Sequence, residues 1–461
     1  MSPYSTHERN TTMTSIKIYD KPLMPLSSLV AAIDAGELDA TFEALGSRGG
    51  APVQRERVKA LCATFAAMYG ADREVGLFTV AGRSELSGNH TDHNHGCVIA
   101  ASISLDVLAV ASPRADGIIR LWSEGFGEDT VEIAFYTEPD ESKFGTSAAL
   151  IAGVCQGFVN NGHAVGGFDA CTVSTVFKGS GLSSSAAFED MIGTILSHLY
   201  NKGEVDEVTF SKISQYAENR FFGKPCGLMD QVACAVGGIV AIDFADPTAP
   251  VIEALPFDMT AAGYHLCIVN TGGNHADLTD DYAAVPAEMK AVAAHFGKAV
   301  LREVTAEQVI AAIPALREKL GDRAILRALH FLSENNRVAS QKAALQTAIA
   351  ADDNATRDSA VDKYFEGVLA SGRSSFCYLQ NVYTVKNITE QGLSLALCLC
   401  EQVLGGKRAA YRVHGGGFAG TVQAYVPAEL VETFTAVMDG AFGEGATYDL
   451  RIRPVGAARI F

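Results

Sequence analysis

Apolar residues recur along the chain at two different spacings, and each spacing predicts one kind of element. From about residue 27 to 70 they recur every three or four positions, as in RERVKALCATFAAMYG, which is the period of an amphipathic helix. From Val75 the apolar runs become short and rich in β-branched residues, as in VGLFTVAGR, and Gly, Pro and Asp separate them. The sequence therefore predicts a helical segment followed by a β-sheet.

The rest of the chain mixes both patterns. SAALIAGVCQGFVNN has a helical period, whereas FDACTVSTVF has the composition of a strand and precedes a helical pattern that runs to about Tyr200. DPTAP has the composition of a linker, and RVHGGGFAGTVQAYV that of two strands around a glycine turn. We find no internal repeat. This order predicts an α+β protein with a tail over residues 1–20, one domain over 21–245 and a second over 246–461.

Charge and cysteine content narrow the class of protein. With 36 Lys and Arg against 53 Asp and Glu, the net charge of −17 disfavours binding to nucleic acid or to anionic membranes. The ten cysteines form no C-x-x-C pair, which is typical of reduced thiols. The N-terminus lacks an apolar signal-peptide core, and the longest apolar stretch, near 97–111, is interrupted by Asp106. We expect a cytoplasmic protein without nucleic-acid or membrane partners.

The segment KGSGLSSSAAFEDMIGTIL has the composition of a phosphate-binding loop. Gly179 and Gly181 allow the backbone to approach a ligand closely, and the first-turn N–H groups of the helix that follows suit a di- or triphosphate. No Gly-Lys-Ser/Thr follows, so the segment is not a Walker A loop. An ordinary serine-capped helix explains a single G-x-G equally well.

A second polar segment, GRSELSGNHTDHNHG, falls between two predicted strands. Arg83, His90 and Asp92 are a dense group of hydrogen-bonding side chains of the kind that grips vicinal hydroxyls of a sugar. A metal site is one alternative, although the spacing is unlike a standard zinc pattern. Its candidate ligands would be His90, Asp92, His93 and His95.

Two further positions suggest a site. Asp230 stands among apolar neighbours, where a carboxylate is costly unless it is partnered or functional, although a helix-capping role also explains it. Glu218, twelve residues earlier, is a possible magnesium ligand. The glycines at 415–417 permit close backbone approach, and a bulge between strands accounts for them as well.

Together, and in this order, these segments resemble the galactokinases of the GHMP small-molecule kinase superfamily. GRSELSGNHTDHNHG is similar to the family's GR-x-NLIGEHTDYN-x-G, GLSSSAAFE to its serine motif, GLMDQ to GIMDQ, and HGGGFAG to TGGGFGG. NTGGNHADLTDDY and FGKAVLREVT also resemble family segments. The resemblance covers roughly residues 75–461. It implies a two-domain GHMP kinase fold of the α+β class, with a ribosomal-protein-S5-like N-terminal domain and a ferredoxin-like C-terminal domain, plus an extra helical N-terminal segment.

The resemblance also implies a role for individual residues. Asp230 matches the family's catalytic base, Arg83 the arginine that pairs with it and with the transferred phosphate, and Ser183 and Glu218 the magnesium-associated pair. The implied sugar contacts are Asn89, His90, Asp92, Gly227 and Tyr282. The implied contacts with ATP are Gly179, Ser180, Gly181, Leu182, Ser183, Ser184, Ser185 and Ala186, with Gly415, Gly416 and Gly417 shaping the floor of the site.

The activity implied is ATP-dependent phosphorylation of galactose at the anomeric hydroxyl, with ATP and Mg²⁺, in a monomer or weak homodimer. Phosphoryl transfer mainly requires in-line positioning and neutralisation of phosphate charge. Arg83 would lower the pKa of Asp230 and keep that carboxylate ionised to accept the sugar's proton. The resemblance and the chemistry therefore agree on the catalytic pair.

Several departures from the family pattern bear on the substrate. Asn89 replaces a Glu that contacts a sugar hydroxyl, and His93 replaces a Tyr. His414 and Ala419 alter the third glycine motif, and SSFCYLQNVY stands where the family has H-x-SL-x-x-DY. A kinase for a related aldose, amino sugar or cyclitol therefore stays open. So do a non-catalytic sensor of galactose and ATP and a structural protein without nucleotide affinity.

Overall fold

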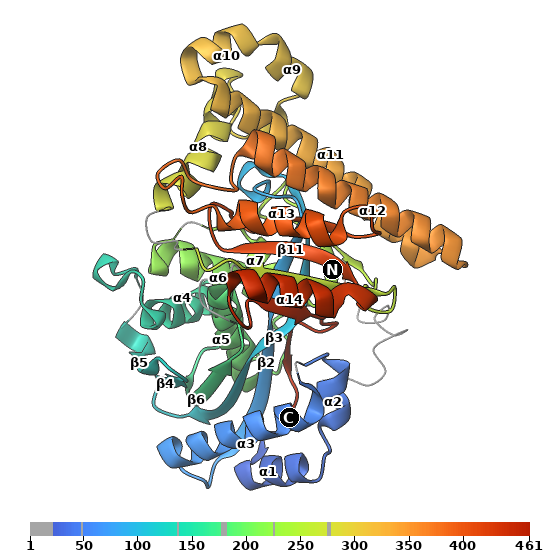
Figure 1. Cartoon of the computed structure of the whole chain (residues 1–461). Coiled ribbons are helices and arrows are strands. Elements are labelled where there is room, and N and C mark those ends of the chain that lie inside the picture. Colours follow the sequence, from blue (N-terminus) through green and yellow to red (C-terminus); the bar gives the residue numbers. More distant parts are fainter. Residues whose placement is uncertain (1–21, 48, 136–137, 177–181, 225, 274–277) are drawn as a thin grey trace.

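The computed structural model describes residues 22–47, 49–135, 138–176, 182–224, 226–273 and 278–461, and Figure 1 shows how its elements are arranged. Among these residues a large sheet has the strand order β1-β2-β3-β6-β4-β5, with β13 paired to β2 and the β7–β8 hairpin paired to β3. A second sheet, β10-β11-β9-β12, is antiparallel throughout. The strands are β1 Met24–Pro25, β2 Glu74–Ser87, β3 Cys97–Arg114, β4 Ile118–Ser123, β5 Gly127–Glu132, β6 Gly167–Ser174, β7 Ile239–Asp243, β8 Val251–Leu255, β9 Tyr264–Asn270, β10 Ala410–His414, β11 Thr421–Pro427, β12 Thr447–Leu450 and β13 Ala457–Arg459.

Helices surround both sheets, and the three that precede β2 confirm the helical segment expected at the start of the chain. No helix among the described residues is long and apolar enough to cross a membrane. Two π-helical turns, η4 (Glu218–Phe222) and η6 (Ser375–Leu379), each continue a longer helix. The α-helices are α1 Leu26–Asp34, α2 Asp39–Ala44, α3 Gly50–Tyr69, α4 Ser147–Asn160, α5 Ser184–Tyr200, α6 Glu207–Ala217, α7 Met229–Val236, α8 Thr279–His295, α9 Ala306–Ala311, α10 Ile313–Leu320, α11 Asp322–Ala350, α12 Asn354–Ser374, α13 Gly392–Leu404 and α14 Val431–Phe442.

The central strands β2 and β3 of the large sheet are buried on both faces, which explains why they contain few exposed polar residues. Because successive side chains of a strand point to opposite faces, Leu77 and Phe78 of β2 enter different cores. Leu77 packs in the cluster formed with α1, α2 and α3, and Phe78 in the cluster formed with α4, α5 and α6. The sheet is thus the middle layer of three.

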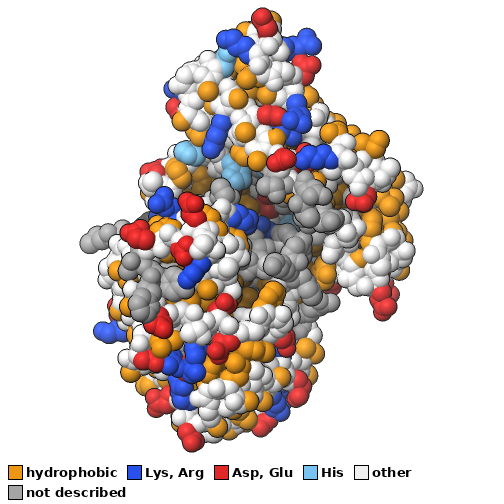
Figure 2. Space-filling model, turned by 90° about the vertical axis from the view of Figure 1, so that its left-hand side faces the viewer, with side chains coloured by type: hydrophobic (Ala, Val, Ile, Leu, Met, Phe, Trp, Pro, Cys, Tyr) orange, Lys and Arg blue, Asp and Glu red, His pale blue; other side chains and the backbone are white. Residues whose placement is uncertain are grey.

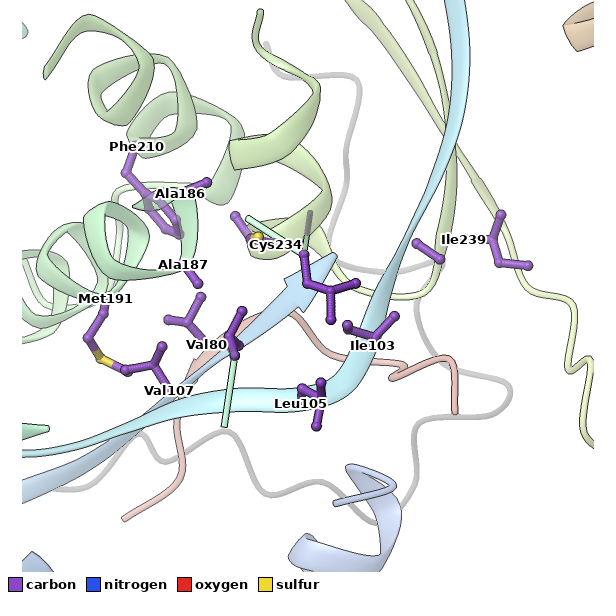
Figure 3. Close-up of a cluster of buried hydrophobic side chains, with 14 of the residues drawn as sticks. Val80, Ile103, Leu105, Val107, Ala186, Ala187, Met191, Phe210, Cys234 and Ile239 are labelled. Atoms are coloured by element: carbon purple, nitrogen blue, oxygen red, sulfur yellow. The ribbon is translucent and has the colours of Figure 1, made fainter. Parts of the chain in front are cut away.

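The core on the α5 side packs against the first turns of α5, the helix that follows the predicted phosphate loop in the sequence. Figure 3 shows side chains from the sheet, among them Val80, Leu105 and Val107, meeting Ala187 and Met191 of α5. Small residues in the first turns of α5 let that helix lie close against β2 and β3. This packing fixes where α5 begins relative to the sheet.

The chain crosses between the two sheets more than once. The DPTAP segment, which the sequence suggested as a linker, joins β7 to β8 within the large sheet, and the chain passes to the second sheet only after β8. At the other end, β13 returns to pair with β2. The domain boundary near residue 246 stays a prediction, but the two halves share the large sheet.

The second half of the chain adds a helical region above the sheets. In Figure 1, α8 to α12 form the upper part of the molecule, and α11 and α12 lie side by side. Figure 2 shows a hollow between this upper part and the lower part of the molecule. The site residues predicted from the sequence lie on elements of the lower part, such as β2, α5 and α7, and on elements of the upper part, such as α8.

Candidate active site

Arg83 follows an irregularity in β2. The register between β2 and β3 shifts between Ala81 and Gly82, and such bulges re-aim the side chains that follow. A side chain at Gly82 would come within 3.2 Å of the Leu182 carbonyl oxygen, to which the Arg83 amide donates a hydrogen bond of 3.2 Å. Glycine at this position therefore lets the chain that enters α5 pass directly beside Arg83.

Asp230 faces Arg83 from the first turn of α7. Arg83 Nε donates to Asp230 Oδ1 at 2.7 Å and Nη2 donates to Oδ2 at 2.9 Å, which is a bidentate ion pair. The hydroxyl of Ser183 donates to the same carboxylate. Leu228 stands at the N-cap of α7 without a side-chain cap, so the alternative that Asp230 merely caps this helix is wrong.

The Asp230 carboxyl group is held ionised and open. Burial alone would raise its pKa, but the charge and hydrogen bonds of Arg83, with the bond from Ser183, outweigh burial and lower the pKa below its ordinary value. The Asp230 side chain keeps 31% of its surface exposed, against 8% for Arg83. The Asp230 carboxylate is therefore accessible to a ligand, while the less exposed Arg83 side chain holds it in place through two hydrogen bonds.

The start of α5 completes this corner. Ser183 occupies the N-cap position with φ +59°, yet its hydroxyl turns to Asp230 and makes no capping bond, so the plain serine-capped helix is wrong. Leu182 and Ala186 are buried in the core, whereas the side chains of Ser183, Ser184 and Ser185 are partly exposed. Gly179, Ser180 and Gly181 lie outside the described residues. A helix start that attracts anions thus lies next to Asp230.

Glu218, on η4, is buried, and both oxygens of its carboxylate accept hydrogen bonds. Its Oε1 accepts from the Ser185 hydroxyl at 3.0 Å and from Lys224 Nζ at 2.7 Å, and its Oε2 accepts from Gln231 at 2.9 Å. The sequence paired Glu218 with Ser183 as a magnesium site. In the structure Ser185 is the serine that contacts Glu218, and Ser183 contacts Asp230.

Two other carboxyl groups near Glu218 have pKa values that are shifted in the opposite direction from that of Asp230. Glu189 and Asp190 are fully buried on α5. Burial raises the pKa of both groups well above its ordinary value, and the charge of Glu218 adds to the effect. The pKa values of Glu189 and Asp190 thus move upward, whereas that of Asp230 moves downward because an arginine accompanies it.

The loop between β2 and β3, residues 88–96, places His90 against Gly416 and Asp92 against Gly227. His90 Nε2 donates to the Gly416 carbonyl oxygen at 2.9 Å, and burial lowers the pKa of this ring to about 4, so it is neutral. A Cβ at Gly227 would lie 2.0 Å from Asp92 Oδ2, so this position needs glycine. His90, Asp92 and Gly227 are therefore brought together.

The turn at residues 415–417 is held from the other side by Tyr282 of α8. The Tyr282 hydroxyl donates to the Gly417 carbonyl oxygen at 2.8 Å, and a Cβ at Gly416 would lie 2.5 Å from the Tyr282 ring. Burial raises the pKa of Tyr282 to about 12, so its hydroxyl stays a donor. The glycine turn thus lies between Tyr282 and the β2–β3 loop.

Asn89 differs from its neighbours because its side chain is enclosed by protein. It is fully buried, and its Nδ2 donates to the Gly415 carbonyl oxygen at 2.7 Å. Its Oδ1 accepts from Asn381 Nδ2 at 2.9 Å and from the Ser375 hydroxyl at 3.2 Å. Asn89 lies beneath the surface that His90 and Asp92 present.

Sequence reasoning missed two residues near this surface. Asn381 bridges Asn89 and the Gly416 carbonyl oxygen, and it belongs to SSFCYLQNVY, whose departure from the family pattern was the available signal. Lys224 pairs with Glu218, and no spacing in the sequence indicated it. Both residues acquire a role only through contacts made on folding.

The metal alternative for the histidine-rich loop has no support. Within the described ranges, no group of three or more His, Cys, Asp or Glu side chains is placed to hold a metal ion. The His90 ring is taken by Gly416, and the backbone amide of His93 donates to Asp92 Oδ1 at 2.9 Å. The loop instead offers hydrogen-bonding groups.

Comparison with known proteins gives family matches across the chain. A family model described as the galactokinase galactose-binding signature matches residues 63–113, and one for the N-terminal domain of GHMP kinases matches residues 148–238. The galactokinase of Streptomyces coelicolor is 32% identical over 384 residues, which is 82% of this chain and 91% of that protein. A galactokinase of Actinobacillus pleuropneumoniae serotype 3 is 31% identical and covers 80% of this chain and 89% of its own.

Solved structures agree on the architecture. Galactokinase from Lactococcus lactis, complexed with galactose, matches with a TM-score of 0.72 at 24% identity over 87% of this chain and all of its own. A mevalonate kinase matches with a TM-score of 0.55 at 12% identity over 82% of this chain and 99% of its own. The expected GHMP kinase fold is confirmed.

Proposed function

The chain belongs to the galactokinase family, and on that premise we propose that it transfers the γ-phosphoryl group of ATP to the anomeric hydroxyl of galactose, giving galactose 1-phosphate. The observation that carries this proposal is the bidentate pair of Arg83 and Asp230, joined by Ser183 at the start of α5. It places an ionised carboxylate and a fixed positive charge beside a helix start suited to phosphates.

Asp230 acts as the base in this proposal. Its low pKa keeps it ionised, so it can hold the sugar hydroxyl as a hydrogen-bond acceptor and take the proton as the new P–O bond forms. Arg83 stays paired with the carboxylate and faces the charge that develops on the transferred group. Both groups are fixed before the ligands arrive, so little reorganisation is needed.

The sugar is proposed to bind against the β2–β3 loop. His90 and Asp92 offer a neutral ring and a carboxylate side by side, and Gly227 leaves room for the Asp92 carboxylate. Tyr282 and the glycine turn at 415–417 close the far side. Asn89, fully buried, would support the loop from beneath rather than contact the sugar.

Mg²⁺ is proposed to accompany ATP near Ser183 and Glu218. Hydroxyl and carboxylate oxygens are the ligands that Mg²⁺ prefers, so the residues present fit it by chemistry. The ion would neutralise phosphate charge. The chain's own residues hold Glu218 ready, because Ser185, Lys224 and Gln231 orient its carboxylate.

A kinase for a related sugar is the second candidate, and one observation favours it. Position 89, where the family has a sugar-contacting Glu, presents no open group here, since the Asn89 amide is used by Gly415, Asn381 and Ser375. A site that lacks one hydroxyl partner discriminates less strictly between sugars. Galactose remains the leading substrate because the relatives compared above are named galactokinases.

The deciding experiment is a substrate panel with Mg·ATP, read as ADP release and as sugar phosphate by NMR. We expect galactose to react fastest and the phosphate to appear at its anomeric carbon. A faster reaction with another aldose, an amino sugar or a cyclitol would replace the substrate. Binding of galactose and ATP without ADP release would favour a sensor, and no nucleotide binding a structural protein.

We also propose a cellular location, an oligomeric state and the absence of two classes of partner. We place the protein in the cytoplasm, as a monomer or weak homodimer that binds neither nucleic acid nor membranes. The net charge of −17 supports the last two points. Size-exclusion chromatography with light scattering measures the oligomeric state, and a dimer that persists at nanomolar concentration would contradict it.

A further inference from the structure

One helix of the second half of the chain lies along the β2–β3 loop and contacts it at several points. Helix α11 reaches the loop with side chains from its inner face. The contacts run from Ser87, before the loop, to Cys97, after it, and no motif in the sequence indicated them. They join residues more than 200 positions apart, so only folding brings them together.

The beginning of the loop is held at both polar backbone groups of Asn89. Glu334 Oε1 accepts from the Asn89 amide and from the Gly88 amide, each at 3.3 Å. One helical turn earlier, His330 Nε2 donates to the Asn89 carbonyl oxygen at 3.0 Å. Two side chains four residues apart therefore bind the N–H and the C=O of the same residue, as their common helix face allows.

The ends of the loop are held by the same helix. Asn335 Oδ1 accepts from the Cys97 amide at 2.8 Å, and Gln341 Oε1 accepts from the Ser87 hydroxyl. We call His330, Glu334, Asn335 and Gln341 the α11 clamp. The clamp thus spans the whole connection that carries His90 and Asp92.

The loop needs such support because its backbone is unfavourable. Gly88 has φ +94°, and His90 and His95 both have φ +59°, a region that residues with side chains rarely occupy. Glycine adopts this conformation freely, but at His90 and His95 it is strained and persists only where the surroundings determine it. A side chain at position 88 would lie 2.5 Å from the Cys97 carbonyl oxygen, so the turn is also sterically closed.

The clamp residues are themselves fixed. Ser371 of α12 donates to Glu334 Oε1 at 2.5 Å and Arg337 Nε donates to Oε2 at 2.6 Å. Burial opposes ionisation of Glu334, but His330, Arg337 and Arg412 lower its pKa to about 2. His330 is fully buried, and its Nδ1 lies 2.9 Å from the Ser374 hydroxyl, which leaves Nε2 to donate to Asn89.

We propose that His330 and Glu334 are positioning residues for the sugar, which set its affinity by holding the β2–β3 loop in the conformation that aims His90 and Asp92 into the site. This inference rests on the proposed function. Neither residue touches the transfer groups Arg83 and Asp230, so the clamp acts on the sugar and leaves the phosphoryl-transfer corner unchanged.

Kinetics and binding of Glu334→Ala test the proposal. Because the variant leaves two backbone amides without their acceptor, we expect KM and Kd for galactose to rise roughly ten- to a hundredfold, with kcat and the Kd for Mg·ATP changed less than about threefold. Glu334→Gln keeps an acceptor oxygen and should recover most of the galactose affinity. His330→Gln, which keeps a donor at similar reach, should behave likewise, and His330→Ala should resemble Glu334→Ala.

A matched control separates positioning from stability. Asp106 on β3 is also fully buried and accepts hydrogen bonds from Arg57 at 2.5 Å and Arg453 at 3.2 Å, away from the loop. Asp106→Asn should lower the midpoint of thermal unfolding while leaving KM for galactose unchanged. Equal increases of KM in Asp106→Asn and Glu334→Ala would overturn the proposal.

Hydrogen exchange gives a readout that does not depend on activity. In the Glu334→Ala variant, amides of residues 88–97 should exchange faster than in the parent, while those of β6 and α5 stay protected. Unchanged exchange in this segment overturns the clamp whatever the enzyme does. Faster exchange in a protein whose parent form phosphorylates no sugar keeps the clamp and rejects the proposed function instead.

Discussion

The two sides of the site are built from different parts of the chain. On the transfer side, Arg83, Ser183 and Asp230 contact one another directly and belong to the first half, around the large sheet. On the sugar side, the β2–β3 loop reaches its conformation through the glycine turn at 415–417, Asn381 and α11, all from the second half. The proposed chemistry is therefore local to one half of the chain, whereas the shape of the proposed sugar site is set where the halves meet.

The two sides also differ in the solvent exposure of their polar side chains. Asp230 keeps part of its surface exposed and carries a charge that Arg83 maintains. Asn89 is closed in on every side, and its neighbours on α11 are equally buried. This difference implies that substitutions on the transfer side change turnover, while substitutions on the sugar side change affinity.

The largest effect is expected for Asp230→Asn. Loss of the base should lower kcat by about 10²–10⁴-fold, because an amide cannot accept the proton, while galactose and Mg·ATP still bind. Single-turnover kinetics and isothermal titration measure the two effects separately. Asp190→Asn is the matched control, since Asp190 is fully buried on α5, where burial raises its pKa, and the variant should retain near-parent turnover.

A smaller loss of turnover is expected for Arg83→Lys. Lysine keeps the charge but not the two parallel bonds to Asp230, so kcat should fall roughly ten- to a hundredfold with a smaller change in KM for galactose. Steady-state assays over a range of galactose concentrations give both constants. Arg57→Lys, at a partly buried arginine that pairs with Asp106 on β3, should leave both unchanged; a pure rise in KM for Arg83→Lys would break the division between the two sides.

The sugar side is tested by Asn381→Leu. Removing this amide takes away one of two donors to Asn89 Oδ1 and one of two donors to the Gly416 carbonyl oxygen, so KM for galactose should rise about tenfold while kcat stays within about threefold. Asn201→Leu removes an amide that binds Ala164, in the first half of the chain, and serves as the control. A fall in kcat with unchanged KM would assign Asn381 to the transfer side.

The smallest effect is expected for Lys224→Met. The Lys224 side chain is 59% exposed, and ion pairs with an exposed partner contribute only about 0–1 kcal/mol, so kcat and KM should change by less than about fivefold. The same kinetic assay at several Mg²⁺ concentrations measures it. A hundredfold loss of kcat would instead make Lys224 a third charged group of the transfer side, beside Arg83 and Asp230.

Much of the fold followed from local pattern. The helical period before residue 70 predicted α1 to α3, and the strand-like run FDACTVSTVF predicted β6. The linker expected at DPTAP turned out to join β7 to β8, because composition marks a turn but not which sheet the next strand joins. Strand partners that lie far apart, such as β13 and β2, leave no local signal.

The candidate site divides in the same way. The Arg83–Asp230 pair could be expected from the order of motifs, and the structure brings the two side chains into contact. The sequence could not indicate that Ser185 would contact Glu218 and that Ser183 would contact Asp230. Neighbouring serines at a helix start have the same side chain, and only the fold sets the direction in which each one points. Nor could the sequence indicate that Asn89 would be buried, since burial depends on Asn381 and Gly415.

The sequence by itself determined the family and the class of chemistry and predicted the residues that would carry it, because motifs combine residue types with short spacings that folding preserves. Only the tertiary structure decided which groups are charged, which face the ligand and which support others. Asp230 and Asp190 are the same residue type, yet Arg83 lowers the pKa of one and burial raises the pKa of the other. The physical reason is that pKa, burial and loop conformation depend on neighbours that lie far away in the sequence.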